Sequence, residues 1–237
     1  MILIDWEKLP PEFQVEQVRP YYDILKKKKL SLICKRVVDI VVSALMLLIL
    51  SPVFLILAIA IKLDSPGPVF YRQVRVTQYG KQFRIFKFRS MVSNADKIGT
   101  QVTVGNDSRV TRMGKLIRKC RLDEISQLID VFRGTMTFVG TRPEVPKYVE
   151  AYTPEMMATL LLPAGVTSLA SIMYKDEDKL LSDAADADKT YVEEVLPGKM
   201  RYNLKAIENY SFLGDIKVMF MTIFAVLGKD YDEGTCL

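Results

Sequence analysis

Histidine is absent from the 237-residue sequence, which also has only three cysteines and a single tryptophan, Trp6. The absence of histidine excludes a histidine base, a histidine metal ligand and any Ser-His or Cys-His triad. Acid–base work would therefore fall to carboxylates, lysine, tyrosine or cysteine. Cys34, Cys120 and Cys236 are far apart and odd in number, so neither a disulfide framework nor a zinc-binding spacing can be assigned. Reduced thiols in the cytosol are the simplest interpretation.

Positive charge is in modest excess, with 33 Lys and Arg against 28 Asp and Glu. A basic balance suits nucleic acid, phosphorylated substrates or the anionic face of a membrane. Hydrophobic residues make up 49% of the chain, at the upper edge for an ordinary globular domain. Most of that excess lies in one stretch near residue 50.

The apolar stretch from Val41 to Ile61 contains no charged residue. A helix of this length would extend roughly 30 Å, about the thickness of a bilayer core, so a transmembrane helix is the default interpretation. Pro52 lacks an N–H and crowds the carbonyl of Leu48, which predicts a bend at Ser51-Pro52. The Ser51 hydroxyl can bond back to a carbonyl one turn earlier.

Basic residues flank the apolar stretch on both sides. They are Lys26 to Lys29, Lys35 and Arg36 before it, and Lys62, Arg72, Arg75 and Lys81 after it. Because positive residues prefer the cytosolic side, neither flank is an obvious candidate for export. A re-entrant hairpin would keep both flanks in the cytosol, but proline-kinked spanning helices are common, so the residues alone leave both topologies open.

Asp39 lies near the start of the apolar stretch, at helical spacing from Lys35 and Arg36. This spacing predicts an ion pair at the end of the helix. The functional alternative is a polar anchor beside a lipid phosphate.

Several other segments have readable patterns. Residues 1–30 end in a lysine run and are predicted to be an interfacial segment attracted to anionic lipid. Residues 69–76 and 81–90 are rich in β-branched and aromatic residues, which predicts two short strands or a hairpin. The cations of that region are interpreted as a solvated face; they are Arg72, Arg75, Arg84, Lys87 and Arg89. Residues 93–108 read as loop.

The second half of the chain is read in the same way. Apolar positions from Leu122 to Phe132 follow a helical period, and Gly134 is a plausible stop. Residues 175–194 are polar and acidic, which predicts a surface helix or loop. Residues 216–227 are apolar nearly all round and too short for a comfortable span, which predicts a core helix or one embedded in the membrane interface.

The acidic pair Asp123-Glu124 directly follows the densest positive field in the chain. Those cations are Arg109, Arg112, Lys115, Arg118, Lys119 and Arg121. An aspartate at the start of a helix is usually an N-cap, and a following glutamate favours the positive helix end. A chain without histidine that joins two carboxylates to a cationic cluster also suits phosphate chemistry. One carboxylate could meet a substrate phosphorus and the other a metal or a nucleophile, while the cations neutralise phosphates.

At this point the sequence resembles a known family, the bacterial monotopic phosphoglycosyl transferases, also called bacterial sugar transferases. The resemblance rests on KRVVDIVVSALMLLILSPVFLILAIAIKLDSPGPVFYRQVRV, FRIFKFRSM, GKLIRKCRLDEISQLIDVFRGTMTFVGTRP and the tail ENYSFLGDIKVMFMTIFAVL. Together these motifs cover most of residues 35–227, and their order makes the set highly specific.

The resemblance implies an α+β, predominantly helical, monotopic membrane protein. Its re-entrant helix would break at Ser51-Pro52, beside a small β-hairpin and interfacial amphipathic helices. We expect an N-terminal interfacial segment at 1–34, a membrane hairpin at 35–64 and a catalytic domain with membrane-associated helices at 65–237. The implied location is the cytosolic face of the bacterial inner membrane.

The resemblance also implies a two-step transfer that begins a bacterial glycoconjugate pathway. The aspartate matching Asp123 attacks the β-phosphate of a UDP-sugar, releases UMP and holds the sugar phosphate covalently. A polyprenyl (undecaprenyl) phosphate then takes the group. Glu124 is implied in binding Mg²⁺ or activating the acceptor, and we assign both Asp123 and Glu124 as candidate metal ligands. Candidate partners beyond membrane lipid are a second copy of the chain and downstream glycosyltransferases, with no nucleic acid.

Other positions carry over one at a time. Arg118 and Arg142 are candidate phosphate ligands, since the guanidinium fork can bond two oxygens. Lys87, in the basic-aromatic strand, is a third candidate for binding phosphate or substrate. Residues 163–172, PAGVTSLASI, depart from the family's usual PGITGWAQV and lack its tryptophan. This departure bears on the sugar pocket and not on the acidic pair.

Two other functional classes compete with a transferase. A non-catalytic, membrane-bound scaffold of a glycan-assembly complex would share most of these motifs, although the intact acidic pair argues against it. A basic nucleic-acid binder would carry its cations as a solvated stripe away from apolar sequence, whereas several cations here flank the apolar stretch.

Overall fold

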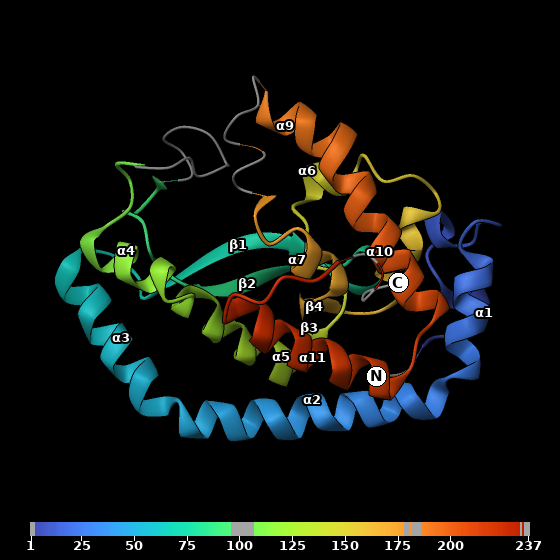
Figure 1. Cartoon of the computed structure of the whole chain (residues 1–237), viewed down its shortest axis with the longest axis horizontal. Helices are drawn as coiled ribbons and strands as arrows, with labels where there is room; N and C mark the ends of the chain where they lie inside the picture. Colours follow the sequence, from blue (N-terminus) through green and yellow to red (C-terminus); the bar gives the residue numbers. More distant parts are fainter. Residues whose placement is uncertain (1–2, 96–106, 178–180, 182–185, 233, 235–237) are drawn as a thin grey trace.

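Helices dominate the computed structural model, which describes residues 3–95, 107–177, 181, 186–232 and 234 (Figure 1). Two separate two-stranded sheets accompany them. The expected α+β, mostly helical class is therefore confirmed. Most of the predicted loop at 93–108 lies outside the described residues. The three-segment division at 1–34, 35–64 and 65–237 stays a prediction.

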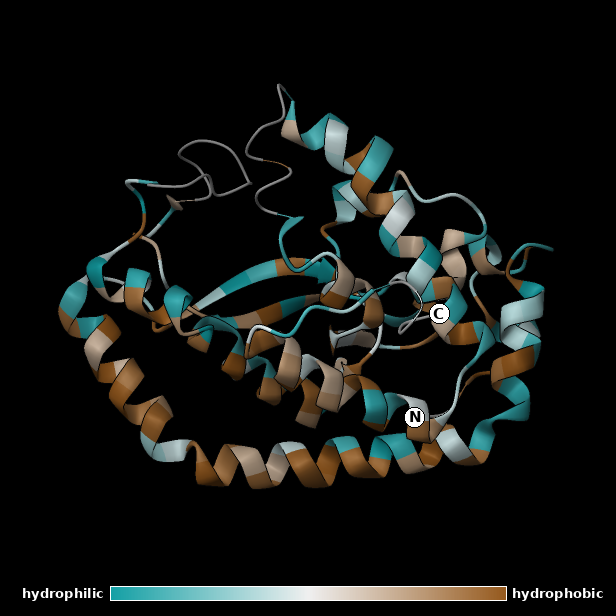
Figure 2. Cartoon of the chain, in the orientation of Figure 1, coloured by the Kyte–Doolittle hydropathy of each residue, from teal (hydrophilic) through white to brown (hydrophobic). Residues whose placement is uncertain are grey.

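The apolar stretch forms two helices that meet at the predicted break. Helix α2 (Lys29–Ile49) is followed by α3 (Ser51–Asp64), and the pair is bent by 60°. Ser51 Oγ donates to the carbonyl of Leu48 at 2.8 Å, as predicted. Figure 1 shows α2 along the lower edge and α3 rising from its end, and Figure 2 shows the apolar colouring concentrated around their junction.

Neither helix alone is long and apolar enough to cross a bilayer, whereas the bent pair taken together meets that criterion. Large side chains exposed on this pair include Leu45, Leu48, Ile49, Leu55 and Ile56.

The predicted hairpin is an antiparallel pair, β1 (Phe70–Val76) and β2 (Gln82–Phe88), in which Phe70 pairs with Phe88. A second sheet was not predicted: β3 (Met136–Val139) runs parallel to β4 (Ala164–Thr167). Both strands are short, and a parallel pair needs a long crossover, so local patterns carry little signal for it.

The remaining helices form the body around these sheets. They are α1 (Arg19–Lys27), α4 (Arg112–Lys119), α5 (Leu128–Arg133), α6 (Pro146–Val149), α7 (Leu169–Met173), α9 (Ala187–Thr190), α10 (Leu196–Glu208) and α11 (Phe212–Val226). Short 3₁₀ segments are η1 (Trp6–Lys8), η2 (Pro11–Phe13), η3 (Gln78–Gly80), η5 (Leu122–Gln127) and η6 (Met156–Leu161), and a π turn spans Tyr191–Val195. The predicted helix at 122–132 is therefore η5 followed by α5, and Gly134 ends it at φ +87°.

Helix α11 covers the predicted apolar segment at 216–227 and is buried on one side only. Val218 and Met221 pack into the body, whereas Phe220, Ile223 and Phe224 are at least half exposed. The structure thus excludes a fully buried core helix for this segment. The predicted surface segment at 175–194 includes α9, and part of it lies outside the described residues.

The N-terminal helices belong to the largest hydrophobic cluster. Phe13, Val18 and Leu25 are fully buried against Leu161 of η6 and Ile207 of α10. Burial of this much apolar surface ties the start of the chain to its C-terminal half. Residues before α2 therefore form an integral layer of the fold.

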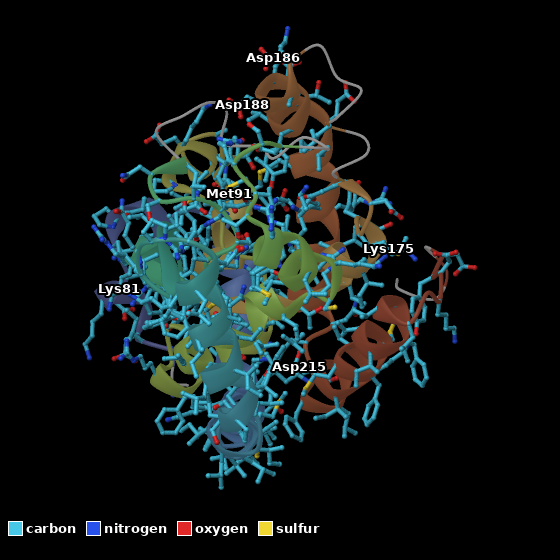
Figure 3. All side chains as sticks on the ribbon, turned by 90° about the vertical axis from the view of Figure 1, so that its left-hand side faces the viewer. Lys81, Met91, Lys175, Asp186, Asp188 and Asp215 are labelled. Carbon is cyan, nitrogen blue, oxygen red and sulfur yellow. The ribbon has the colours of Figure 1, made fainter. Side chains whose placement is uncertain are left out.

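A polar stripe on α2, made of Lys35, Arg36 and Asp39, joins the bent pair to the body. Lys35 Nζ contacts Asp215 of α11 at 2.6 Å and donates to the carbonyl of Val139 at 2.7 Å. Figure 3 shows Asp215 in the lower half of the molecule, and α11 contacts α2.

Arg36 caps the end of α5 by donating to the carbonyls of Val131 and Phe132 at 2.7 and 2.9 Å. The Val131 carbonyl also accepts the N–H of Gly134 at 3.1 Å, so the Arg36 cation reinforces the C-terminal cap of α5.

The predicted ion pair of Asp39 with Lys35 or Arg36 is wrong. Asp39 is only 2% exposed and accepts hydrogen bonds from Thr137 Oγ1 at 2.7 Å and the Phe138 N–H at 3.1 Å. The Asp39 carboxylate thus accepts hydrogen bonds from two donors of strand β3, while Lys35 and Arg36 bind groups on other elements. Tertiary contacts override the local i,i+4 pairing, which is worth only about 0.2–0.5 kcal/mol.

We expect Asp39→Ala to lower the free energy of unfolding by about 3 kcal/mol, because it leaves two buried donors without an acceptor. Chemical denaturation in detergent micelles measures this loss. The control is Asp23→Ala, which breaks an exposed pair with Arg19 on α1 and should cost less than about 1 kcal/mol. Equal losses in both variants would contradict the assigned role of Asp39.

Candidate active site

The acidic pair follows a sharp backbone turn. Helix α4 ends at Lys119, and Arg121 then adopts the left-handed conformation, with φ +54° and ψ +26°. Its N–H donates to the carbonyl of Arg118 at 3.0 Å, and η5 starts at the next residue. A non-glycine residue in this region carries strain of order 1 kcal/mol, and such strain concentrates at functional sites.

The N-cap interpretation of Asp123 is wrong, because the cap position of η5 belongs to Arg121 and the acidic pair occupies the first turn. In a 3₁₀ helix, adjacent side chains point about 120° apart. The two carboxylates therefore have separate surroundings.

Glu124 joins three parts of the chain. Lys87 of β2 contacts its Oε1 at 3.1 Å, and Arg142, which follows β3, binds both carboxylate oxygens, with Nη1 to Oε2 at 3.3 Å. Two-point binding by a guanidinium fixes direction as well as charge. The structure thus brings together three residues that the sequence analysis selected separately.

These charges shape one another's protonation. Burial opposes ionisation of Glu124, but the positive charges of Arg142 and Lys87 outweigh it and hold the pKa of Glu124 well below its ordinary range. The Glu124 charge in turn raises the pKa of Arg142. Burial lowers the pKa of Lys87, and Glu124 offsets part of that shift.

Asp123 differs from its neighbour. Burial, and then the Glu124 charge, raise the pKa of Asp123, while Lys87 and Arg118 act in the opposite direction. Among the described residues, the ion pairs of the acidic pair all belong to Glu124. A carboxylate that is desolvated and held beside cations without being paired suits a nucleophile better than a structural anchor.

The other predicted residues lie at different distances from the pair. Arg118 on α4 donates from Nε to Ser90 Oγ at 2.9 Å, and its charge reaches Asp123 electrostatically. Ser51 and Pro52 lie at the helix break, on elements apart from η5. Ser126 Oγ donates to the carbonyl of Phe86 at 3.0 Å, which holds η5 against β2.

The predicted solvated face of the hairpin is wrong for three of its five cations, which are Arg75, Lys87 and Arg89. Besides Lys87, Arg89 donates to the carbonyls of Ile61, Ser65 and Pro66 at the end of α3. Arg72 lies over the Phe86 ring at 3.5 Å. Arg72 and Arg84 both keep exposed side chains.

Arg75 was missed as a candidate for the site. Its Nη1 donates to the carbonyl of Pro143 at 3.0 Å, which holds the residue next to Arg142. The sequence pattern indicates a partner for Lys87 but not for Arg75. Lys87 follows Phe83 and Ile85 on the same face of the strand, and a lysine on a buried face needs a partner.

Residues 163–172, which depart from the family pattern, form β4 and the start of α7. Gly165 packs so closely on Gly140 that a Cβ would lie 2.2 Å from the Gly140 backbone. Ser168 and Leu169 help to line a cavity of about 290 Å³ between the β3 end, α10 and α11. The residues that line it do not include Asp123 or Glu124, so the cavity is separate from the acidic pair.

The part of the chain that the structure describes has no cluster of three or more acidic or cysteine side chains that could hold a metal ion. Carboxylate oxygens from Asp123 and Glu124 nevertheless suit Mg²⁺, which commonly takes one or two carboxylates together with substrate phosphates and water. The donor set therefore fits Mg²⁺ in company with a diphosphate.

Comparison with known proteins places the chain in a class. The family model described as bacterial sugar transferase matches residues 30–229. The chain belongs to the bacterial sugar transferase family, which confirms the resemblance drawn from its motifs.

Individual relatives carry more detailed names. The chain is 36% identical to a UDP-N-acetylgalactosamine-undecaprenyl-phosphate N-acetylgalactosaminephosphotransferase of Aeromonas hydrophila, over 81% of this chain and 43% of the relative. It is 38% identical to a UDP-glucose:undecaprenyl-phosphate glucose-1-phosphate transferase of Escherichia coli (strain K12), over 80% and 39%. An exopolysaccharide production protein of Rhizobium leguminosarum bv. phaseoli is 32% identical, over 84% and 98%. The chain thus spans about two fifths of the length of the first two relatives.

We expect the Asp123 carboxyl to titrate above its ordinary pKa of 3.8, and Glu124→Gln to lower that pKa. The substitution removes the adjacent negative charge and leaves the Lys87 and Arg142 charges unpaired beside Asp123. Carbon-13 NMR of aspartate-labelled protein, assigned with Asp123→Asn, measures the shift. Asp5, whose pKa is lowered by its bond to Lys8, serves as the control. An unchanged Asp123 titration in Glu124→Gln would contradict this account.

Proposed function

We propose that the chain is a phosphoglycosyl transferase that moves a sugar 1-phosphate from a UDP-sugar to polyprenyl phosphate. The observation that carries the proposal is the separation of roles in the acidic pair: Glu124 is ion-paired to Lys87 and Arg142, while Asp123 is desolvated beside them. The family membership and the activities for which the relatives are named support the same reaction.

The first step forms a bond between an Asp123 carboxylate oxygen and the β-phosphorus of the donor. The bond from that phosphorus to the bridging oxygen breaks, and UMP leaves with the electron pair. Arg118, Lys87 and Arg142 supply positive charge where the diphosphate and the leaving group carry negative charge. The partial desolvation of Asp123 strengthens these interactions.

The second step transfers the group to lipid. An oxygen of polyprenyl phosphate attacks the same phosphorus, the bond to Asp123 breaks, and the carboxylate is regenerated. Two displacements at one phosphorus divide a difficult transfer into two easier ones. The product is a polyprenyl diphosphate-sugar, and the sugar 1-phosphate arrives intact.

Mg²⁺ is part of the proposal. Asp123 and Glu124 would hold it together with donor phosphate oxygens. When bound, the ion would polarise the phosphoryl oxygens and reduce their charge. Glu124, already fixed by Arg142 and Lys87, would keep a constant orientation toward the diphosphate.

We also propose a monotopic topology at the cytosolic face of the bacterial inner membrane. The α2–α3 pair would enter one leaflet, turn at Ser51-Pro52 and return. Its support is the 60° bend together with the exposed apolar residues of the pair. The half-exposed face of α11 would lie at the same interface, with Phe220 and Phe224 toward lipid.

Incubation of the membrane-embedded protein with UDP-sugars, Mg²⁺ and polyprenyl phosphate should release UMP. Asp123→Asn should reduce release by at least about 10³-fold, since it removes the nucleophile. Asp186→Asn, at the exposed N-cap of α9, is the control and should retain activity. A donor panel scored by UMP identifies the sugar. Folded protein that releases no UMP with any donor would support the scaffold alternative instead.

Topology is tested with single cysteines. Because Cys34 and Cys120 are exposed, all three native cysteines are first replaced by alanine. Leu30→Cys and Pro66→Cys should both be protected from an impermeant thiol reagent in intact spheroplasts and should both react after lysis. Lys189→Cys, on the exposed α9, marks the side of the catalytic body. Labelling of residue 66 alone in intact spheroplasts would show a membrane span.

A further inference from the structure

A buried cluster of charged groups, apart from the acidic pair, surrounds Lys199 of α10. Lys199 is 4% exposed, and its Nζ lies 2.9 Å from Glu177 Oε2, 3.7 Å from Glu144 Oε1 and 3.1 Å from the Tyr191 hydroxyl. The hydroxyl of Tyr191 donates to Glu144 Oε1 at 2.5 Å. A buried ammonium that is neutralised by two carboxylates, one of them fixed by a hydroxyl, is costly to assemble and specific in geometry.

Glu144 connects this cluster to the candidate active site, because it is two residues from Arg142. Its carbonyl accepts the N–H of Val76 at 2.9 Å, and Arg75 donates to the carbonyl of Pro143 at 3.0 Å. The backbone of the 142–144 segment is therefore held by β1, and the Glu144 side chain is held by the Lys199 cluster.

The backbone around Tyr191 is specialised for this contact. Tyr191 begins a π turn between α9 and α10. Such turns are rare within helices and are frequent at functional sites. The extra residue in the turn shifts the register of the helix, and in this chain both Tyr191 and Lys199 reach the same carboxylate.

Three carboxylates interact electrostatically with Arg142, namely those of Glu124, Glu177 and Glu144. Lys199 and Tyr191 occupy Glu144, so Glu124 is the partner that Arg142 binds at two points. Removing the hydroxyl would leave Glu144 free to compete for the guanidinium.

We propose that Glu144, Tyr191 and Lys199 form a positioning brace that directs Arg142 toward Glu124 and the donor diphosphate. This inference rests on the proposed function for the identity of the donor. The brace residues act through Arg142 and do not themselves contact the reacting atoms.

The test is a double-mutant cycle between Tyr191→Phe and Arg142→Lys, measured on the full chain in nanodiscs. Tyr191→Phe should lower both UDP affinity and kcat/KM about tenfold, because a hydrogen bond to a charged group is lost. In the Arg142→Lys background the same change should cost less than about twofold. Glu144→Gln provides a second, independent variant: it removes the carboxylate that would compete for Arg142, so adding it to Tyr191→Phe should restore most of the lost UDP affinity.

The matched control is Tyr148→Phe. Tyr148 is also buried and its ring packs at a tilt against that of Tyr191, with centroids 4.5 Å apart, but its hydroxyl donates to Asp188 at 2.5 Å. Figure 3 shows Asp188 near the top of the molecule, by α9. Tyr148→Phe should lower the melting temperature comparably while changing UDP affinity and kcat/KM less than about twofold.

The outcomes separate the two proposals. Additive effects of Tyr191→Phe and Arg142→Lys, or equal effects of Tyr148→Phe, would overturn the brace even if the protein transfers sugar phosphate. Non-additive effects on UDP affinity without UMP release from any donor would support the brace and overturn the proposed reaction. Failure of wild-type protein to bind UDP would overturn both.

Discussion

The two-point ion pair between Arg142 and Glu124 is the interaction on which the rest of the site depends. It joins η5 to the segment after β3, and Lys87 adds β2 to the same carboxylate. Partly buried charges are tolerated only when their partners arrive in good geometry, because desolvation would otherwise outweigh attraction. The η5 helix, the β1–β2 hairpin and the segment after β3 must therefore all be folded before Asp123 and Glu124 acquire their two distinct environments.

The same reasoning explains how a helix with a large exposed apolar surface is attached to a polar body. Lys35, Arg36 and Asp39 stand at the start of an otherwise apolar stretch, and each satisfies a group on a different element. Apolar packing alone would let α2 slide or rotate, whereas directional bonds to β3, α5 and α11 specify one position. The bend at Ser51-Pro52 then sets the direction of α3, whose last carbonyls are bound by Arg89.

Much of the fold was predictable because its signals are local. The bend follows from the missing N–H of Pro52, the hairpin from β-branched and aromatic runs, and the stop at Gly134 from a left-handed turn. The acidic pair and its neighbouring cations were visible in the residues, and the family resemblance added the roles expected of them. The β3–β4 pair had no comparable signal, because each strand is short and its partner is distant in the chain.

The sequence by itself determined which chemical groups the protein has. It contains no histidine, an acidic pair beside a cationic cluster, and one broken apolar stretch. Only the tertiary structure decided which charges meet. Asp39 bonds to β3 rather than to its neighbours in the helix, and Glu144 belongs to Lys199 and Tyr191 rather than to Arg142. The physical reason is that local ion pairs are worth a few tenths of a kcal/mol. Burial and contacts with distant segments each contribute more free energy than a local ion pair, so they determine which charged groups are paired.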